Sequence, residues 1–140
     1  MTSVFLDTSG LIALVNTDDR WHRKAESIWV ELSASVASLL TSSLVLIELA
    51  DGLSRVRHRG LAIQLVDALE RSRRVEIVQV DQRLEKLGWQ LFRDRADKDW
   101  GMTDCVSMSL LTERRIDVVF TADHHFEQAG FRILLGEHGA

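Results

Sequence analysis

The stretch SVFLDTSGLIAL, residues 3–14, joins a short strand-like segment to an ionisable residue and then to a second apolar run. Val4, Phe5 and Leu6 are residue types that favour a buried strand. Asp7 follows them directly, and the apolar pattern resumes at Leu11. A buried carboxylate is costly unless it is paired, so the stretch predicts a strand that ends at a residue with a role other than packing.

The composition fits one globular unit, and we expect a single domain over residues 1–140. The chain is 46% hydrophobic and 27% charged, which is ordinary for a soluble protein. No apolar run approaches the ~18 residues of a membrane helix, and the N-terminus lacks the pattern of a secretory signal, so we expect no membrane association and a cytoplasmic location. A single cysteine, Cys105, excludes an intramolecular disulfide and a thiolate metal cluster.

The charge is slightly negative overall but unevenly distributed. Asp and Glu number 21 against 17 Lys and Arg, which argues against a generally basic nucleic-acid binder. The basic residues gather at 55–59, 71–74, 93–98 and 114–115. Two interpretations stay open for each cluster: a solvated face or helix C-terminus, or a rim that contacts phosphates.

Hydrophobic periodicity predicts alternating strands and helices. Apolar residues recur at helical spacing in 21–32, where Asp18 or Asp19 could cap the start, and the tryptophans of that stripe are expected to face the core. Further helices are predicted at 44–56, 61–74, 81–92 and 103–115, and strands at 4–6, 36–43, 75–80, 117–123 and 131–135. This order predicts an α/β fold of three layers (α/β/α), with a central, mainly parallel sheet of four to five strands.

Two acids follow predicted strands directly. Asp7 ends the first strand, and Asp123 follows the apolar VVFT. Functional groups in open α/β sheets gather beyond the carboxyl ends of the strands, where the winding direction reverses. Asp7 and Asp123 are therefore predicted to be neighbours, although they lie far apart in the sequence.

Two further acids stand in apolar or helix-initiating surroundings. Glu48 interrupts LVLIELA between Ile47 and Leu49, and a pairing with an arginine is its structural alternative. Asp104 follows Thr103 at a predicted helix start, where an acid also interacts favourably with the helix dipole. Neither residue alone establishes a site.

Four clustered carboxylates would need a counter-charge. At about 4 Å each pair repels by roughly 1 kcal/mol in water and by about 4 kcal/mol at an effective dielectric constant of 20. A divalent cation removes this repulsion, and oxygen ligands without cysteine or a well-placed histidine favour Mg²⁺ or Mn²⁺ over Zn²⁺. The chemistry that uses such a site is metal-assisted hydrolysis of a phosphodiester.

Four motifs together resemble a known family. FLDTSGLIAL, LIELADGL, WGMTDCVSMSLL and VVFTADHHFEQAGF are similar, in order and spacing, to the four acidic motifs of PIN-domain nucleases, and the length is similar to that of VapC-like toxins. The resemblance implies that the acids bind Mg²⁺ or Mn²⁺ and activate water for RNA cleavage; they are Asp7, Glu48, Asp104 and Asp123.

The same resemblance implies supporting residues and partners. Ser9 and Thr121 fall where the family has small hydroxyl residues that support the site. Asp99 could be an accessory ligand or a solvated loop acid. VapC-like proteins are the toxin halves of toxin-antitoxin pairs, so the resemblance implies a cognate antitoxin, whose C-terminal segment covers the acidic groove, and a homodimer.

Other enzyme classes fit poorly. Haloacid-dehalogenase-like phosphatases need an acid where Ser9 stands, receiver domains need a late lysine that is absent after Lys98, and Cys105 is expected to face the core. Two alternatives to a toxin stay open: a PIN-like RNA-processing nuclease outside a toxin-antitoxin system, and a catalytically silent module that binds RNA or protein. Retention of all four acids favours a metal-dependent endoribonuclease, and the sequence does not identify its RNA.

Overall fold

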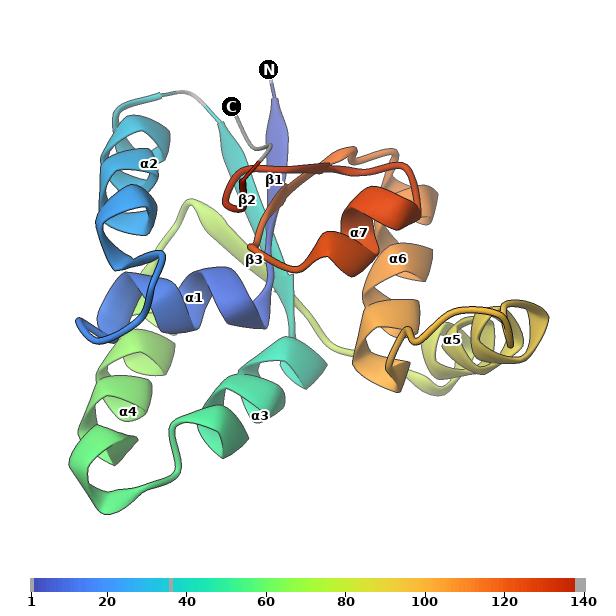
Figure 1. Cartoon of the computed structure of the whole chain (residues 1–140), viewed down its shortest axis with the longest axis horizontal. Coiled ribbons are helices and arrows are strands. Elements are labelled where there is room, and N and C mark those ends of the chain that lie inside the picture. Colours follow the sequence, from blue (N-terminus) through green and yellow to red (C-terminus); the bar gives the residue numbers. More distant parts are fainter. Residues whose placement is uncertain (1, 36, 138–140) are drawn as a thin grey trace.

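A parallel sheet forms the centre of the molecule (Figure 1). The computed structural model describes residues 2–35 and 37–137, so residue 36, the first of the predicted segment 36–43, lies outside them. Within the described residues the sheet has five strands, all parallel, in the order β3-β2-β1-β4-β5. They are β1 (Ser3–Leu6), β2 (Ser38–Ser42), β3 (Val75–Val78), β4 (Val118–Phe120) and β5 (Arg132–Ile133). The predicted α/β class with a mainly parallel sheet is confirmed.

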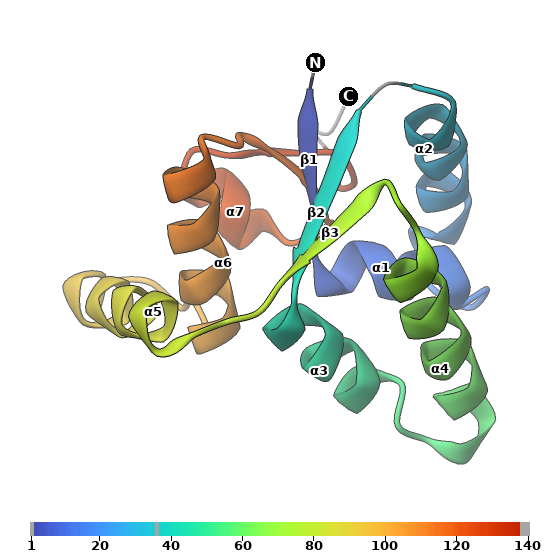
Figure 2. The ribbon, with the colours of Figure 1, turned by 180° about the vertical axis from the view of Figure 1, so that it is seen from behind.

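Helices cover both faces of this sheet. In Figures 1 and 2, α1, α2 and α4 lie on one side of the strands, and α5, α6 and α7 lie on the other. No helix among the described residues is long and apolar enough to cross a membrane. The helices are α1 (Thr8–Val15), α2 (His22–Ala34), α3 (Ser43–Gly52), α4 (Val56–Arg71), α5 (Gln82–Asp94), α6 (Met102–Arg114) and α7 (His124–Gln128).

The strand order sets the position of the functional edge. The chain starts at the central β1, proceeds through β2 to β3 on one side, and then crosses to β4 and β5 on the other. The winding direction therefore reverses between β1 and β4, which are hydrogen-bonded neighbours with Leu6 opposite Phe120. Asp7 follows β1 and Asp123 lies just beyond β4, so both occupy the carboxyl edge at this reversal.

Polar residues begin several helices largely as the sequence indicates. The Ser42 hydroxyl accepts a hydrogen bond from the Val45 backbone at 3.2 Å, and Asp81 accepts one from Leu84 at 2.9 Å. The prediction for α2 needs correction, because its N-cap is Trp21, which makes no side-chain cap. Asp19 instead accepts from the Trp21 backbone at 2.8 Å, which shapes the turn before the helix.

The core lies on both faces of β1 and β4. Phe5, Leu6 and Phe120 are fully buried, and Trp29 of α2 packs on Phe120 with ring centroids 5.8 Å apart. Trp21 and Trp29 of this stripe are both partly buried against the core, so both tryptophans contribute to packing, as expected. Arg74, from the second basic cluster, donates to the carbonyls of residues 32, 33, 35 and 37 at 2.6–2.9 Å. This arginine stabilises the C-terminus of α2, which fits the structural interpretation of its cluster.

Gly10 lets α1 approach β4 closely. A Cβ at this position would lie 2.2 Å from the Phe120 carbonyl oxygen and 2.7 Å from its carbon. Both neighbours are backbone atoms, so neither can move aside without shifting the strand. The glycine in DTSG is therefore required for the first helix to start beside β4.

We expect Gly10→Ala to lower the free energy of unfolding by about 2–3 kcal/mol, because the added methyl group must push α1 off β4. Gly60, in the middle of α4, is a matched control, since a Cβ there would meet nothing within 4 Å. Gly60→Ala should raise the free energy of unfolding by about 0.5–1 kcal/mol through helix propensity. Urea denaturation of both variants measures these changes in the free energy of unfolding. Equal changes in the two variants would contradict the close approach of α1 to β4.

Candidate active site

Four acids from four segments of the chain converge at the carboxyl edge of β1 and β4. Asp7 follows β1, Glu48 lies on α3, Asp104 lies on α6 and Asp123 begins α7. The charges of Asp104 and Glu48 both raise the pKa of Asp7, and the charge of Asp123 raises the pKa of Asp104. The structure thus brings together the four carboxylates that the sequence singled out.

Asp7 is the buried member of this group. Its exposed fraction is 3%, and its Oδ2 accepts a hydrogen bond from the Thr121 hydroxyl at 2.8 Å. Burial is the main reason why its pKa is raised to about 7. Hydrogen bonds from Thr121 and from the Thr8 backbone oppose this increase, while the charges of Asp104 and Glu48 add to it.

A chain of hydroxyl groups holds Asp7 in place. The Thr121 hydroxyl donates to Asp7, so in its 2.6 Å contact with Ser9 it accepts, and Ser9 donates. Ser9 in turn accepts from the Ala122 backbone at 2.9 Å, and the Thr121 oxygen accepts from the Asp123 backbone at 3.1 Å. The two hydroxyl residues therefore connect the carboxylate after β1 to the loop after β4.

Glu48 is held by a neighbour of Asp7. The hydroxyl of Thr8 donates to Glu48 Oε1. In the described part of the chain no arginine pairs with Glu48, so the structural alternative considered for it is wrong. Its neighbours differ in burial, because Leu49 is buried whereas Ile47 is 60% exposed, which places Glu48 where the core meets the surface. The apolar surroundings that the sequence gives to Glu48 are therefore buried on the Leu49 side and exposed on the Ile47 side.

Asp104 and Asp123 each serve a helix start as well as the cluster. Asp104 Oδ2 accepts from the Gly101 backbone at 3.1 Å, and Asp123 Oδ1 accepts from the His125 backbone at 2.9 Å. Burial and then the charge of Asp123 raise the pKa of Asp104, whereas the contacts with Gly101 and His125 lower it. The structural role that the sequence offered for Asp104 is thus present together with its place in the cluster.

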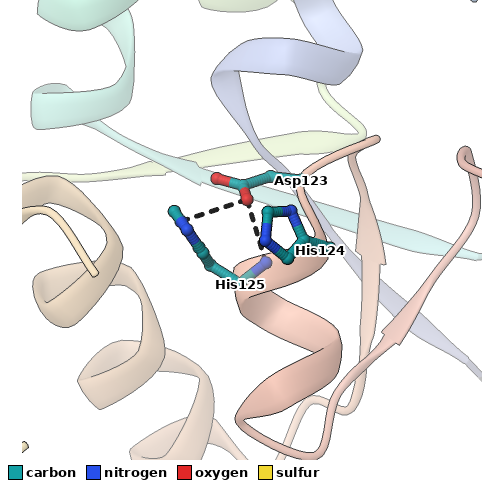
Figure 3. Close-up of side chains that lie close together, drawn as sticks. All are labelled: Asp123, His124 and His125. Atoms are coloured by element: carbon teal, nitrogen blue, oxygen red, sulfur yellow. Dashed lines mark hydrogen bonds and ion pairs between the residues drawn. The ribbon is translucent and has the colours of Figure 1, made fainter. Parts of the chain in front are cut away.

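A histidine that sequence reasoning missed stands between these two acids. His125 Nδ1 lies 3.2 Å from Asp104 Oδ2. It also lies 3.2 Å from Asp123 Oδ1, a contact that Figure 3 shows. The ligand atoms of Asp123, His124 and His125 lie within 4.8 Å of one another. The expectation from the sequence that no histidine lies near the four acids is therefore wrong. The groups that could bind a metal ion here include the imidazole of His125 as well as the carboxylates. The available signal was the spacing DxH at a helix start, which turns the second residue back toward the aspartate.

Three further residues with polar or reactive side chains, Asp99, His22 and Cys105, lie apart from this arrangement. Asp99 is exposed in the loop before α6, and no described contact joins it to the four acids. His22 contacts the Ala13 carbonyl oxygen through Nδ1 at 2.8 Å, which is a structural contact between α2 and α1. Cys105 is buried and its thiol pKa is raised, chiefly by burial, so it is not poised as a nucleophile.

The cluster has the electrostatics of a cation site. Among the described ion pairs, none joins a lysine or arginine to any of the four acids. The charges therefore repel one another, and this repulsion adds to the burial that raises the pKa of Asp7. Carboxylate oxygens with one imidazole nitrogen fit a small divalent cation, which would supply the missing positive charge.

We expect Asp7→Asn to stabilise the metal-free protein in a pH-dependent way. The folded pKa of about 7 exceeds the usual value near 4, so stability falls as the pH rises from 4 to 7 and is constant above. The shift in pKa corresponds to a loss of at most about 4 kcal/mol in the free energy of unfolding of the wild type. We expect Asp7→Asn to recover about 2 kcal/mol of it at pH 8, because the amide cannot accept every hydrogen bond of the carboxylate. Urea denaturation in EDTA measures it.

The gain should become small near pH 4, where the wild-type carboxyl group is protonated in the folded state and about half protonated in the unfolded state. Asp67→Asn, an exposed aspartate of α4, controls for the change in net charge and should show no such pH dependence. A gain of equal size at pH 4 and pH 8 would show that burial of the charge is not the cause.

Comparisons with known proteins agree with this geometry. A family model described as PIN domain matches residues 4–132. VapC20 of Mycobacterium tuberculosis, named a 23S rRNA-specific endonuclease, is 30% identical over 129 residues, which are 91% of this chain and 95% of VapC20. The crystal structure of VapC20, described as a sarcin-ricin loop cleaving toxin, matches with a TM-score of 0.83 and 26% identity over 91% of this chain and 95% of that one.

Two more distant structures share the fold. VapBC2 from Rickettsia felis, bound to a promoter DNA fragment, matches with a TM-score of 0.68 at 17% identity over 92% of this chain and 94% of that chain. FitAcB from Neisseria gonorrhoeae matches with a TM-score of 0.64 at 17% identity over 93% and 95%. The resemblance seen in the four acidic motifs is confirmed, and the chain belongs to the PIN-domain family, with a VapC toxin among its relatives.

Proposed function

We propose that this protein is a metal-dependent endoribonuclease and the toxin of a toxin-antitoxin pair. The observation that carries the proposal is the convergence of Asp7, Glu48, Asp104 and Asp123 at one sheet edge, without a lysine or arginine partner among the described residues. A bound cation would relieve the repulsion among these carboxylates. Family membership and the name of the VapC20 relative support nuclease activity.

The residues divide the work according to their positions. Bound Mg²⁺ or Mn²⁺ would acidify the attacking water and neutralise charge on the phosphate. Asp7 and Asp123 would hold the principal ion, because they follow the adjacent strands β1 and β4 and both contact the Thr121 hydroxyl, Asp7 through its carboxylate and Asp123 through its backbone. Glu48 and Asp104 would complete the pocket, where they would bind a second ion or orient the water. In this hydrolysis the water oxygen would bond to phosphorus and the bond from phosphorus to a ribose oxygen would break. The water would lose a proton, and the leaving ribose oxygen would take one up.

Ribosomal RNA is the first substrate to test. VapC20 is named for 23S rRNA, and its crystal structure is described as that of a toxin that cleaves the sarcin-ricin loop. At 30% identity the acidic site can be shared while the RNA differs, since specificity comes from the groove and loops. The arginines of cluster 55–59 are candidates for phosphate contacts.

The partners follow from the same relationships. We place the protein in the cytoplasm as one domain over 1–140, in a homodimer inhibited by a cognate antitoxin. The similarity to VapC20, described as a toxin, supports this assignment. The alternatives are an RNA-processing nuclease without an antitoxin and a silent binding module, and the second is disfavoured because all four acids are present.

We expect Mg²⁺ or Mn²⁺ to support cleavage of 23S rRNA and EDTA to abolish it. Asp7→Asn and Asp123→Asn should each lower the cleavage rate by about a thousandfold, which corresponds to the several kcal/mol that a metal site contributes. Gel analysis of RNA incubated with each protein measures the rate. Asp67→Asn makes the same chemical change on the exposed face of α4 and should cleave like the wild type.

Three results would contradict the proposal. Full activity of Asp7→Asn would exclude the acidic site, and cleavage in EDTA would exclude the metal. Absence of cleavage from every RNA offered, together with absence of metal binding by calorimetry, would favour the silent binding module.

We further expect Thr121→Val to slow cleavage by about 10- to 100-fold, because it removes the hydroxyl that orients Asp7 and accepts from the Asp123 backbone. Thr112→Val is the matched control, since its hydroxyl donates to the Met108 carbonyl within α6, away from the acids. Initial rates at saturating metal separate the two variants. Equal rates would show that the hydroxyl chain does not position the site.

A further inference from the structure

We propose that His125 is a ligand of the catalytic cation, together with Asp104 and Asp123, and that its nitrogen makes the site favour Mn²⁺ over Mg²⁺. The inference rests on the proposed function and specifies the ion that it uses. It extends the site beyond the four acids, because it adds an imidazole nitrogen to their carboxylate oxygens.

The distances around His125 fit ligands of one ion. Nδ1 lies 3.2 Å from Asp104 Oδ2 and 3.2 Å from Asp123 Oδ1. Neighbouring ligands of an octahedral ion with bonds of about 2.1 Å are separated by about 3.0 Å. The imidazole nitrogen thus has the separation from both oxygens that a shared ion would impose, after a shift of a few tenths of an ångström.

Hydrogen bonding alone explains this position less well. Nδ1 carries at most one hydrogen, yet it faces two carboxylates at the same distance. Both separations exceed the ~2.7–2.9 Å that is usual for a hydrogen bond between a charged nitrogen donor and a carboxylate. One nitrogen equidistant from two carboxylate oxygens is the arrangement expected where all three groups bind one cation.

The two carboxylates do not need the ring to orient them. The Gly101 backbone holds Asp104 at 3.1 Å, and the backbone of His125 itself holds Asp123 at 2.9 Å. The imidazole is therefore not needed to orient either carboxylate, and the lone pair of its nitrogen is available to bind the ion. In Figure 3 the ring of His125 points toward the Asp123 carboxylate from the first turn of α7.

Solvent can deliver an ion to these three side chains. Their exposed fractions are 22% for His125, 15% for Asp104 and 26% for Asp123, so the cluster is neither sealed nor fully hydrated. A mixed set of carboxylates and one imidazole suits a first-row transition ion better than Mg²⁺, which prefers oxygen. Mn²⁺ accepts both donor types and is paramagnetic, which makes it the probe.

The test is pulsed electron paramagnetic resonance of Mn²⁺ bound to the full chain without a polyhistidine tag. Electron spin echo modulation detects a nitrogen bound directly to Mn²⁺. We expect this signal in the wild type, its loss in His125→Gln and its retention in His124→Gln. His124 is the matched control, because it is the exposed neighbour whose ring lies 4.6 Å from that of His125.

Calorimetry of the same proteins adds a second readout. Loss of any residue around a metal can weaken binding by about 10- to 100-fold, so a weaker Kd alone does not separate a ligand from a positioning residue. The ratio of the Kd for Mg²⁺ to the Kd for Mn²⁺ separates these two roles, because only a nitrogen ligand favours Mn²⁺ over Mg²⁺. We expect this ratio to fall about tenfold in His125→Gln. Equal weakening of both ions would overturn the inference.

The wild-type spectrum decides the question even if a variant fails to fold. Bound Mn²⁺ without nitrogen modulation, or no Mn²⁺ binding at all, overturns the inference, and so does a signal that disappears in His124→Gln but persists in His125→Gln. RNA cleavage by the same samples separates the two proposals. Cleavage with Mn²⁺ but no nitrogen signal leaves the proposed function intact, whereas a nitrogen signal without cleavage supports the ligand and removes the nuclease.

Discussion

The hydrogen bond from Thr121 to the buried carboxylate of Asp7 is the contact on which the arrangement of the site depends. It joins the residue after β1 to the residue after β4, at the place where the winding of the sheet reverses. Ser9 and the backbone of Asp123 attach to the same hydroxyl. Since Gly10 brings α1 against the Phe120 backbone, the glycine and the hydroxyl residues of DTSG serve one purpose, which is to fix a charge at this junction.

The carboxylates at this junction destabilise the metal-free fold because they repel one another, and the same concentration of negative charge favours the binding of a cation. Burial and the charges of neighbouring acids raise the pKa of Asp7, so the empty protein carries electrostatic repulsion at neutral pH. The free energy that this repulsion removes from folding is recovered when a cation binds, because binding to the folded state alone stabilises it. Removal of one charge is therefore expected to strengthen the fold while it weakens the site.

The sequence identified those parts of the site that depend on strand topology. Asp7 and Asp123 were predictable because parallel strands bring their carboxyl ends to one edge, and Glu48 and Asp104 because acids interrupted apolar or helix-start patterns. The partner of Glu48, Thr8, was missed, since a hydroxyl beside a carboxylate has no periodic signature. The start of α2 was misplaced because Asp19 shapes the turn before Trp21 instead of the helix itself.

His125 was missed for a different physical reason. Its side chain reaches the acids because α7, His124–Gln128, has Asp123 as its N-cap, so the first turn directs the ring toward that aspartate. Position i+2 from a strand-terminal aspartate is remote in an extended chain and adjacent in a capped turn. The backbone hydrogen bond from His125 to Asp123 fixes that turn, and the same residue then presents its imidazole to Asp104 on α6. Metal ligands predicted from acidic residues alone are therefore an incomplete set where one of the acids caps a helix, because the first turn can bring another side chain beside it.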